Sequence, residues 1–225
     1  KQVSDSYGRF VYGIPPRGYA DLAFAQHMLA SLKADGRMGV ILPHGVLFRG
    51  GEEGKIREGL LFGNDAISGN QPGDLIEAIV GLPSALFYNT PIPACVLILN
   101  KQKPAALKGK IIFIDASRAY LEGKAQKSLR AEDIASIVST HKSAFQQQTE
   151  VENYCRLVTL DEIRSNDGNL NLAHYISNGK TEQAIDVAAT LKQLAALAQE
   201  ETQIDKQLNV YLAELGLLEA INEPV

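Results

Sequence analysis

The stretch Leu82–Asn100, LPSALFYNTPIPACVLILN, decides the predicted fold of this chain. It follows one apolar run, Leu75–Gly81, and ends in another, Ala94–Leu99. Both runs are short, rich in Ile, Val and Leu, and bounded by Gly, Pro or Asn, which is typical of buried strands. Three prolines stiffen the segment between them, because proline restricts φ and has no amide donor. The sequence therefore predicts two buried strands joined by a stiff loop.

This loop carries two adjacent aromatic residues, Phe87 and Tyr88, followed by Asn89. One interpretation is a hydrophobic plug under the loop, and the other is a recognition site. A loop without a helix does not make a right-handed parallel crossover, so we expect strand 94–99 to run antiparallel to strand 75–81. The aromatic loop then follows the carboxyl end of a strand. Open α/β sheets have their binding sites at this edge, so the position of the loop favours the recognition site over the hydrophobic plug.

The segments before this loop alternate between helical and strand patterns. We expect a helix over 20–32, a buried strand over 37–42 and an amphipathic helix over 52–61. Together with the later strands, this alternation indicates an open α/β sheet with helices on its faces.

Three residues after strand 37–42 are candidates for the same rim of the sheet: His44, Gly50 and Gly51. The glycines permit positive φ or a close approach of the backbone to a ligand. His44 is either a ligand or base, or a loop histidine held by a hydrogen bond.

The remaining segments are assigned from local pattern. Residues 1–19 predict a loop that wraps or packs on the body, and the polar residues 64–74 predict a mobile loop. Further expected elements are a strand at 111–115, a helix at 128–145, a strand with a helical turn at 154–163, and a strand at 172–176. We expect three parts: an α/β part at 1–118, a small α/β appendage at 119–180, and a helical tail at 181–225.

The tail is predicted to be one long helix over 181–218, with no Pro or Gly before Gly216. From Leu197 to Leu215 its apolar seam follows heptad spacing, interrupted by Glu201. The tail from Thr181 onward is acidic, which disfavours nucleic acid and favours a protein partner. The helix either packs on its own body or docks on a partner helix.

Composition narrows the class of protein. The chain has 225 residues, of which 45% are hydrophobic and 21% charged, as in ordinary globular proteins. No apolar run approaches the roughly 20 residues of a membrane span, and no signal peptide opens the chain. Cys95 and Cys155 give no disulfide framework, and the four histidines are too scattered for a metal site. We expect a cytoplasmic protein, and because it begins at Lys1 we expect a fragment.

Four strings in sequence resemble the modification subunit of type I restriction-modification systems. They are RGYADLAFAQH at 17–27, GRMGVILPHGVLFRGG at 36–51, EGKIR at 53–57 and LPSALFYNT at 82–90. The resemblance runs from about residue 5 to residue 176 in order.

The resemblance implies an N6-adenine DNA methyltransferase that uses S-adenosylmethionine. It implies the carboxyl-terminal half of a Rossmann-like methyltransferase sheet with an antiparallel last strand. The family's Gly-rich cofactor loop and its Asn-Pro-Pro-Phe/Tyr tetrapeptide are absent from these 225 residues, so we expect no primary catalytic residue here and no activity of the chain alone. Implied partners are double-stranded DNA, the specificity and restriction subunits, and a second modification subunit. No metal or membrane is implied.

The resemblance also implies roles for particular residues. An adenine that leaves the duplex stack needs flat apolar surfaces, so Phe87, Tyr88 and Asn89 are implied to contact the target base. Asp21 and Phe24 are implied to border the cofactor pocket. Two alternatives stay open: a non-catalytic assembly or DNA-binding module, and a fragment of a stand-alone adenine methyltransferase.

Overall fold

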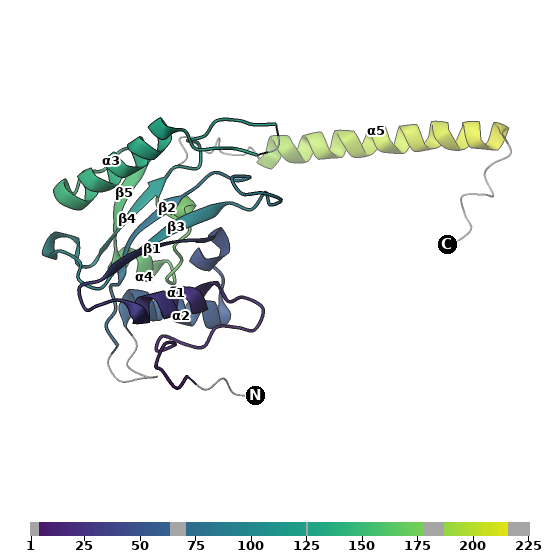
Figure 1. The fold of residues 1–225 in the computed structure, drawn as a ribbon. Coiled ribbons are helices and arrows are strands. Elements are labelled where there is room, and N and C mark those ends of the chain that lie inside the picture. The colour runs from purple at the N-terminus through teal and green to yellow at the C-terminus, as the bar shows by residue number, and fades with distance from the viewer. Residues whose placement is uncertain (1–4, 64–70, 125, 178–186, 216–225) are drawn as a thin grey trace. The chain divides into compact units, whose positions relative to one another are not determined.

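The strands of the chain form one five-stranded sheet in the computed structural model, which describes residues 5–63, 71–124, 126–177 and 187–215 (Figure 1). The strands are β1 (Arg37–Pro43), β2 (Ile76–Gly81), β3 (Ala94–Asn100), β4 (Lys110–Asp115) and β5 (Cys155–Thr159), in the order β1-β3-β2-β4-β5. β3 is antiparallel to both β1 and β2, β4 is parallel to β2, and β5 is antiparallel to β4. The predicted antiparallel pairing of the two strands around the aromatic loop is confirmed.

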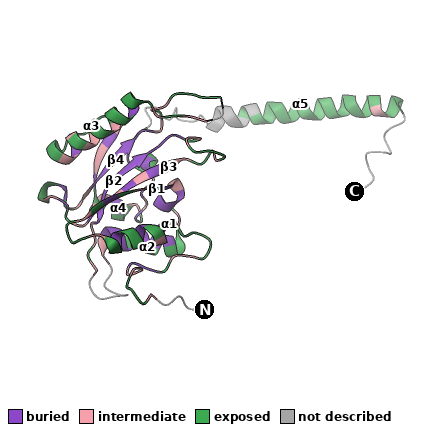
Figure 2. Cartoon of the chain, viewed as in Figure 1, coloured by how far each residue is buried: buried purple, intermediate pink, exposed green. Residues whose placement is uncertain are grey.

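Helices cover both faces of this sheet (Figure 1). They are α1 (Asp21–Ser31), α2 (Gly51–Phe62), α3 (Ala131–Gln147) and α4 (Leu160–Ser165), with short 3-10 turns η1 (His44–Leu47), η2 (Ala105–Leu107) and η3 (Leu172–His174). Successive strand residues face opposite sides, so Ile79 joins the core cluster of α1 and α2, whereas Ala78 and Val80 join the cluster under α3. Figure 2 shows the buried strands between the half-exposed helices.

Strand β1 differs from its prediction. We expected a buried strand, but Arg37, Gly39 and Ile41 are exposed while Met38 and Leu42 are buried. The reason is position: within the described residues β1 lies at the edge of the sheet and pairs only with β3. By contrast β2, which lies in the sheet interior, is buried at every residue, as predicted.

The amino-terminal segment packs on the body as a loop, which was one of its two predicted forms. The Tyr12 side chain is buried, and its hydroxyl donates to the Pro72 carbonyl at 2.8 Å. The Gln26 side chain in α1 donates to the Gly13 carbonyl at 2.9 Å and accepts from the Tyr12 amide at 3.2 Å. The absence of a side chain at Gly59 in α2 leaves room for the Tyr12 ring.

The segment after α3 follows its prediction in part. The strand and helical turn expected over 154–163 are confirmed as β5 and α4. The strand expected over 172–176 is wrong, because this segment forms the 3-10 turn η3, where the Asn171 side chain accepts the Ala173 amide at 3.4 Å. β5 pairs with β4 in the main sheet, and the division of the chain at residue 118 stays a prediction.

The chain divides into two compact units, Lys1–Gly179 and Lys180–Val225. In the second unit the predicted tail helix is confirmed over α5 (Val187–Glu214); its expected ends at 181–186 and 216–218 lie outside the described residues. Most of the loop predicted to be mobile, 64–70, also lies outside them. Among the described residues, no helix is both long enough and apolar enough to cross a bilayer.

Candidate functional site

The loops that follow three of the strands lie at one edge of the sheet. β1 and β2 are both antiparallel to β3 and therefore point the same way, and β4 is parallel to β2. Their carboxyl ends, Pro43, Gly81 and Asp115, consequently lie along one rim. The backbone amide of His44 donates to the Pro93 carbonyl at 3.0 Å, which joins the loop after β1 to the loop after β2.

The aromatic loop Leu82–Pro93 exposes both of its aromatic side chains. Phe87 is 40% exposed and Tyr88 is 82% exposed, so the hydrophobic-plug interpretation is wrong. Ala85 has a φ of 54°, a left-handed value that is costly for alanine, and the exposed Asn89 has a φ of 58°, which asparagine tolerates better. The loop therefore holds two aromatic rings near water at the rim, at the expense of backbone strain.

An open cavity of about 230 Å³ adjoins this loop, and we call it the apolar rim cavity. Its lining comes from the end of β1, the aromatic loop and the start of β3: Ile41, Leu42, Pro43, Phe87, Thr90, Ile92, Pro93 and Ala94. Of the three residues predicted for the target base, Phe87 lines the cavity, while Tyr88 and Asn89 are exposed beside it in sequence. This lining offers apolar surface to a flat ligand.

His44 lies in a second cavity on the same rim, together with Asp115. Within the described residues its ring makes no hydrogen bond, so the alternative of a hydrogen-bonded loop histidine is not observed. Burial lowers the pKa of His44, and the negative charge of Asp115 offsets part of this lowering. A largely neutral imidazole therefore lies at the rim near neutral pH.

Asp21 lies at the start of α1 and contacts Arg49, which lies just before α2. The Arg49 guanidinium lies 3.8 Å from the Asp21 carboxylate, 3.6 Å from Glu53 and 4.3 Å from the centre of the Tyr19 ring. The guanidinium also lies close over Gly45, since a Cβ at this position would be 2.5 Å from it and the flexible Arg49 side chain would have to shift.

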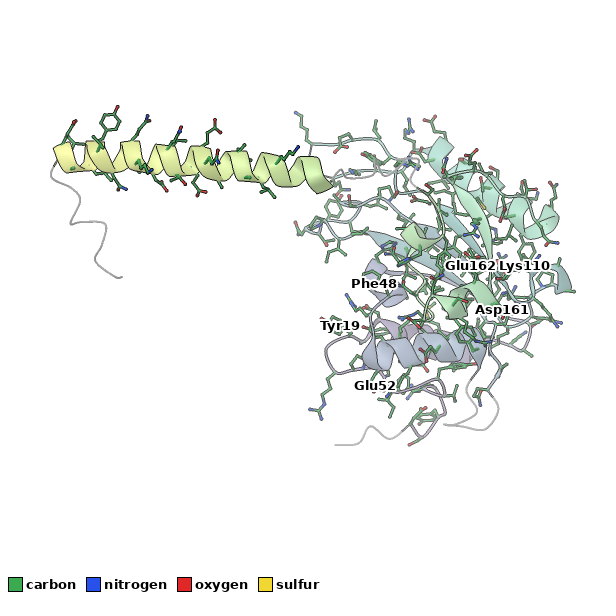
Figure 3. The ribbon with its side chains drawn as sticks, turned by 180° about the vertical axis from the view of Figure 1, so that it is seen from behind. Tyr19, Phe48, Glu52, Lys110, Asp161 and Glu162 are labelled. Carbon is green, nitrogen blue, oxygen red and sulfur yellow. The ribbon has the colours of Figure 1, made fainter. Side chains whose placement is uncertain are left out.

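Aromatic residues close in sequence to Asp21 and Arg49 are exposed. Phe24 on α1 is 66% exposed, and Tyr19 and Phe48 are also exposed. Figure 3 shows Tyr19 and Phe48 on the same side of the molecule, with Glu52 in the first turn of α2 below them. Of the predicted glycines, Gly51 has a φ of 65°, which glycine adopts freely, while Gly50 has an ordinary negative φ.

Two residues that were not predicted from the sequence, Arg57 and Glu53, also hold the rim in place. The buried Arg57 of α2 donates to the carbonyls of Val46 at 3.2 Å, Arg49 at 2.8 Å and Gly168 at 2.8 Å. Glu53 is buried, and burial raises the pKa of its carboxyl, an effect that Arg49 opposes. Both residues could have been identified from the sequence, because Glu53 and Arg57 are charged residues on the apolar face of the predicted helix.

Neither cysteine is a candidate nucleophile. Burial raises the pKa of Cys95 to about 12 and that of Cys155 to about 11, so both thiols stay protonated near neutral pH. Across the described residues there is also no group of three His, Cys, Asp or Glu side chains placed to hold a metal ion.

Comparison with known proteins assigns the family. The N-6 DNA methylase family matches residues 1–184, so the chain belongs to this family. It is 38% identical over 210 residues to the type I restriction enzyme MjaVIII methylase subunit of Methanocaldococcus jannaschii, covering 92% of this chain and 34% of that protein. It is 32% identical to the HindI methylase subunit of Haemophilus influenzae, covering 92% of this chain and 46% of that one.

A solved structure agrees with this assignment. The type I restriction-modification methyltransferase subunit from Streptococcus thermophilus has a TM-score of 0.66 and 35% identity, covering 77% of this chain and 34% of that one. The resemblance to modification subunits of type I systems is thus confirmed. The chain spans between about a third and a half of the length of these relatives.

Proposed function

We propose that this chain is part of a site-specific DNA adenine-N6 methyltransferase, the modification subunit of a type I restriction-modification system. Its sheet is the carboxyl-terminal half of a Rossmann-like methyltransferase sheet, a proposal supported by an antiparallel β3 between the parallel strands β1 and β2. The missing Gly-rich loop and tetrapeptide belong to the remainder of the protein, so the chain alone is inactive. The whole protein acts in the cytoplasm.

One observation carries this proposal: exposed aromatic rings on a strained loop at the carboxyl rim of the sheet. An adenine extruded from a duplex loses its stacking neighbours, and aromatic side chains replace them. Phe87 lines a cavity of apolar character and Tyr88 extends into solvent, so the loop offers such a surface. In our proposal Phe87 stacks on the target base, and Tyr88 and Asn89 contact it or the adjacent DNA.

The residues near α1 fit one wall of an S-adenosylmethionine site. The cofactor, when bound, supplies the methyl group that is transferred to the adenine amino group. Phe24 offers an exposed ring to the flat purine of the cofactor, and the half-buried Asp21 carboxylate offers hydrogen-bond acceptors beside it. His44, Gly50 and Gly51 belong to the loop between this wall and the base site.

The tail helix is proposed to dock the specificity subunit. Taken by itself, α5 exposes Leu197, Ile204, Leu208 and Tyr211, which lie on one heptad seam. A lone helix with an apolar seam has no core of its own and needs a partner surface. The restriction subunit and a second modification subunit complete the proposed assembly on double-stranded DNA.

The base-stacking role is tested by changing Phe87 and Tyr88 together to Ala in the whole protein with its specificity partner. Stacking on a base contributes about 1–3 kcal/mol, so we expect kcat/KM for DNA methylation to fall about 100-fold. Binding of S-adenosylmethionine, measured by calorimetry, should persist.

Tyr7→Ala is the matched control, because Tyr7 is 81% exposed and lies away from the rim loops in a different cavity. It should leave methylation unchanged. Full activity of the double variant would show that the aromatic loop does not hold the target base.

A further inference from the structure

A second cavity, of about 350 Å³, lies on the same rim, and we call it the polar rim cavity. Four separate segments contribute its polar side chains: His44 after β1, Ser84 after β2, Asp115 and Ser117 at the end of β4, and Asn171 before η3. Pro93 lines both this cavity and the apolar rim cavity, so the two cavities are neighbours.

The last of these segments is fastened to the rim by the fold. The Leu170 amide donates to the Leu47 carbonyl at 2.9 Å. Leu172 packs so closely on Gly81 that a Cβ there would lie 2.9 Å from the Leu172 side chain. Because the residues on both sides of Asn171 are held in this way, the Asn171 amide has a defined place in the cavity wall.

Several polar groups in the wall have no protein partner among the described residues. The His44 ring makes no hydrogen bond there, and neither does the side-chain nitrogen of Asn171. Asp115 is 8% exposed and uses Oδ1 to accept the Ser117 amide at 3.0 Å, which leaves Oδ2 free within the described part of the chain. Hydrogen-bond donors and a carboxylate acceptor therefore line one small cavity. Each of these groups can form a hydrogen bond with a ligand that carries the complementary group.

The charge of the wall selects the class of ligand. Among its described lining residues there is no Lys or Arg, and Asp115 is negative, so a phosphate group is repelled. An uncharged ligand with an N–H group for Asp115 and acceptors for Asn171 and His44 fits better. The hydrogen-bonding edges of nucleobases carry both kinds of group, and a carboxylate accepts base N–H groups in known recognition pairs.

We infer that the polar rim cavity binds the edge of a second nucleobase of the DNA, next to the base held at Phe87. This inference rests on the proposed function, because it assumes that DNA reaches this rim. Asp115 and Asn171 are then base-contacting residues in a subunit whose partner reads the recognition sequence.

The test measures methylation by the whole protein with its specificity partner on duplexes in which single bases are replaced by abasic sites. The positions tested are those flanking the target adenine on both strands and the one opposite it. We expect one position at which base removal lowers kcat/KM about tenfold in the natural protein. In Asp115→Asn and in Asn171→Ala, removal of that base should change kcat/KM less than twofold, because the contact is already lost.

Asn171 is only half-buried, so we expect Asn171→Ala to fold even if Asp115→Asn folds poorly. The test can then be completed with the Asn171 variant alone. His174→Ala is the control: His174 is exposed, belongs to the same turn η3 and does not line the cavity, so the tenfold effect should remain. Equal effects of base removal in the natural protein and both variants, at every position, would overturn the inference alone. Failure of the natural protein to methylate the intact duplex would instead overturn the proposed function, and the inference with it.

Discussion

Glu77 is a carboxylate on the interior strand β2 that the surrounding residues keep ionised. It is fully buried and accepts hydrogen bonds from Arg37, from Asn100 at 2.7 Å and from His141 at 3.0 Å. Burial alone raises the pKa of Glu77, but the three hydrogen bonds together outweigh burial and lower it. The network joins β1, β2, β3 and α3, so one side chain connects most of the sheet with the helix on its second face.

A lowered pKa makes this contribution depend on pH. The stabilisation is present above the ordinary glutamate pKa near 4.5 and is lost as the pH falls through the lower pKa of the folded state. We expect Glu77→Gln to lower the free energy of unfolding at pH 7 by about 2 kcal/mol, because charge-assisted hydrogen bonds are replaced by weaker ones. The loss of stability below pH 4.5 should also become shallower. Urea denaturation from pH 3 to pH 7 measures both, with the exposed Glu122→Gln as an unchanged control.

At the scale of single elements, α2 shows how surroundings decide the effect of a helical glycine. Gly54 and Gly59 both lie inside this helix, where alanine is intrinsically favoured by up to about 1 kcal/mol. A Cβ at Gly54 would have its nearest neighbours at 3.6 Å and 3.8 Å, which are ordinary contacts. A Cβ at Gly59 would lie 2.9 Å from the buried Tyr12 ring.

The two substitutions should therefore have opposite signs. Gly54→Ala should raise the free energy of unfolding by about 0.5–1 kcal/mol. Gly59→Ala should lower it by about 1 kcal/mol, since overpacking by about 1–3 kcal/mol exceeds the gain in helix propensity. Thermal denaturation of the two variants provides the comparison, and stabilisation by both would mean that Tyr12 does not pack on α2.

At the scale of the whole molecule, the chain combines a sheet-based unit with a second unit whose described residues, 187–215, contain the helix α5. The apolar seam of α5 is the expected contact with the specificity subunit. Leu208→Asp places a charge on the seam and should weaken binding of that subunit at least about tenfold, because a charge is costly to bury in an apolar interface.

Val210→Asp is the matched control for this change. Val210 is exposed on the same helix and lies two residues from Leu208, away from the seam. Leu208→Asp lowers helix propensity more than Val210→Asp, but by less than about 0.7 kcal/mol, which is smaller than the roughly 1.4 kcal/mol of a tenfold loss of binding. Binding measured by titration calorimetry should distinguish them, and equal affinities of the two variants would argue against docking through the seam.

Local sequence patterns determined which segments form strands and helices, and where the aromatic loop lies. The prolines of Leu82–Pro93 even predicted the antiparallel direction of β3, because chain connectivity restricts that choice. The same patterns misassigned segment 172–176, since the short apolar run LAHYI fits a strand as well as a 3-10 turn.

Only the tertiary structure decided which distant residues meet. Asn171 reaches the rim beside His44 and Asp115, and Glu77 finds Arg37 and His141, across separations that no local pattern encodes. The exposure of β1 and of Phe87 likewise depends on which neighbours cover them. Local preference sets the backbone conformation of a segment, whereas burial and polar pairing depend on the packing of segments far apart in the chain.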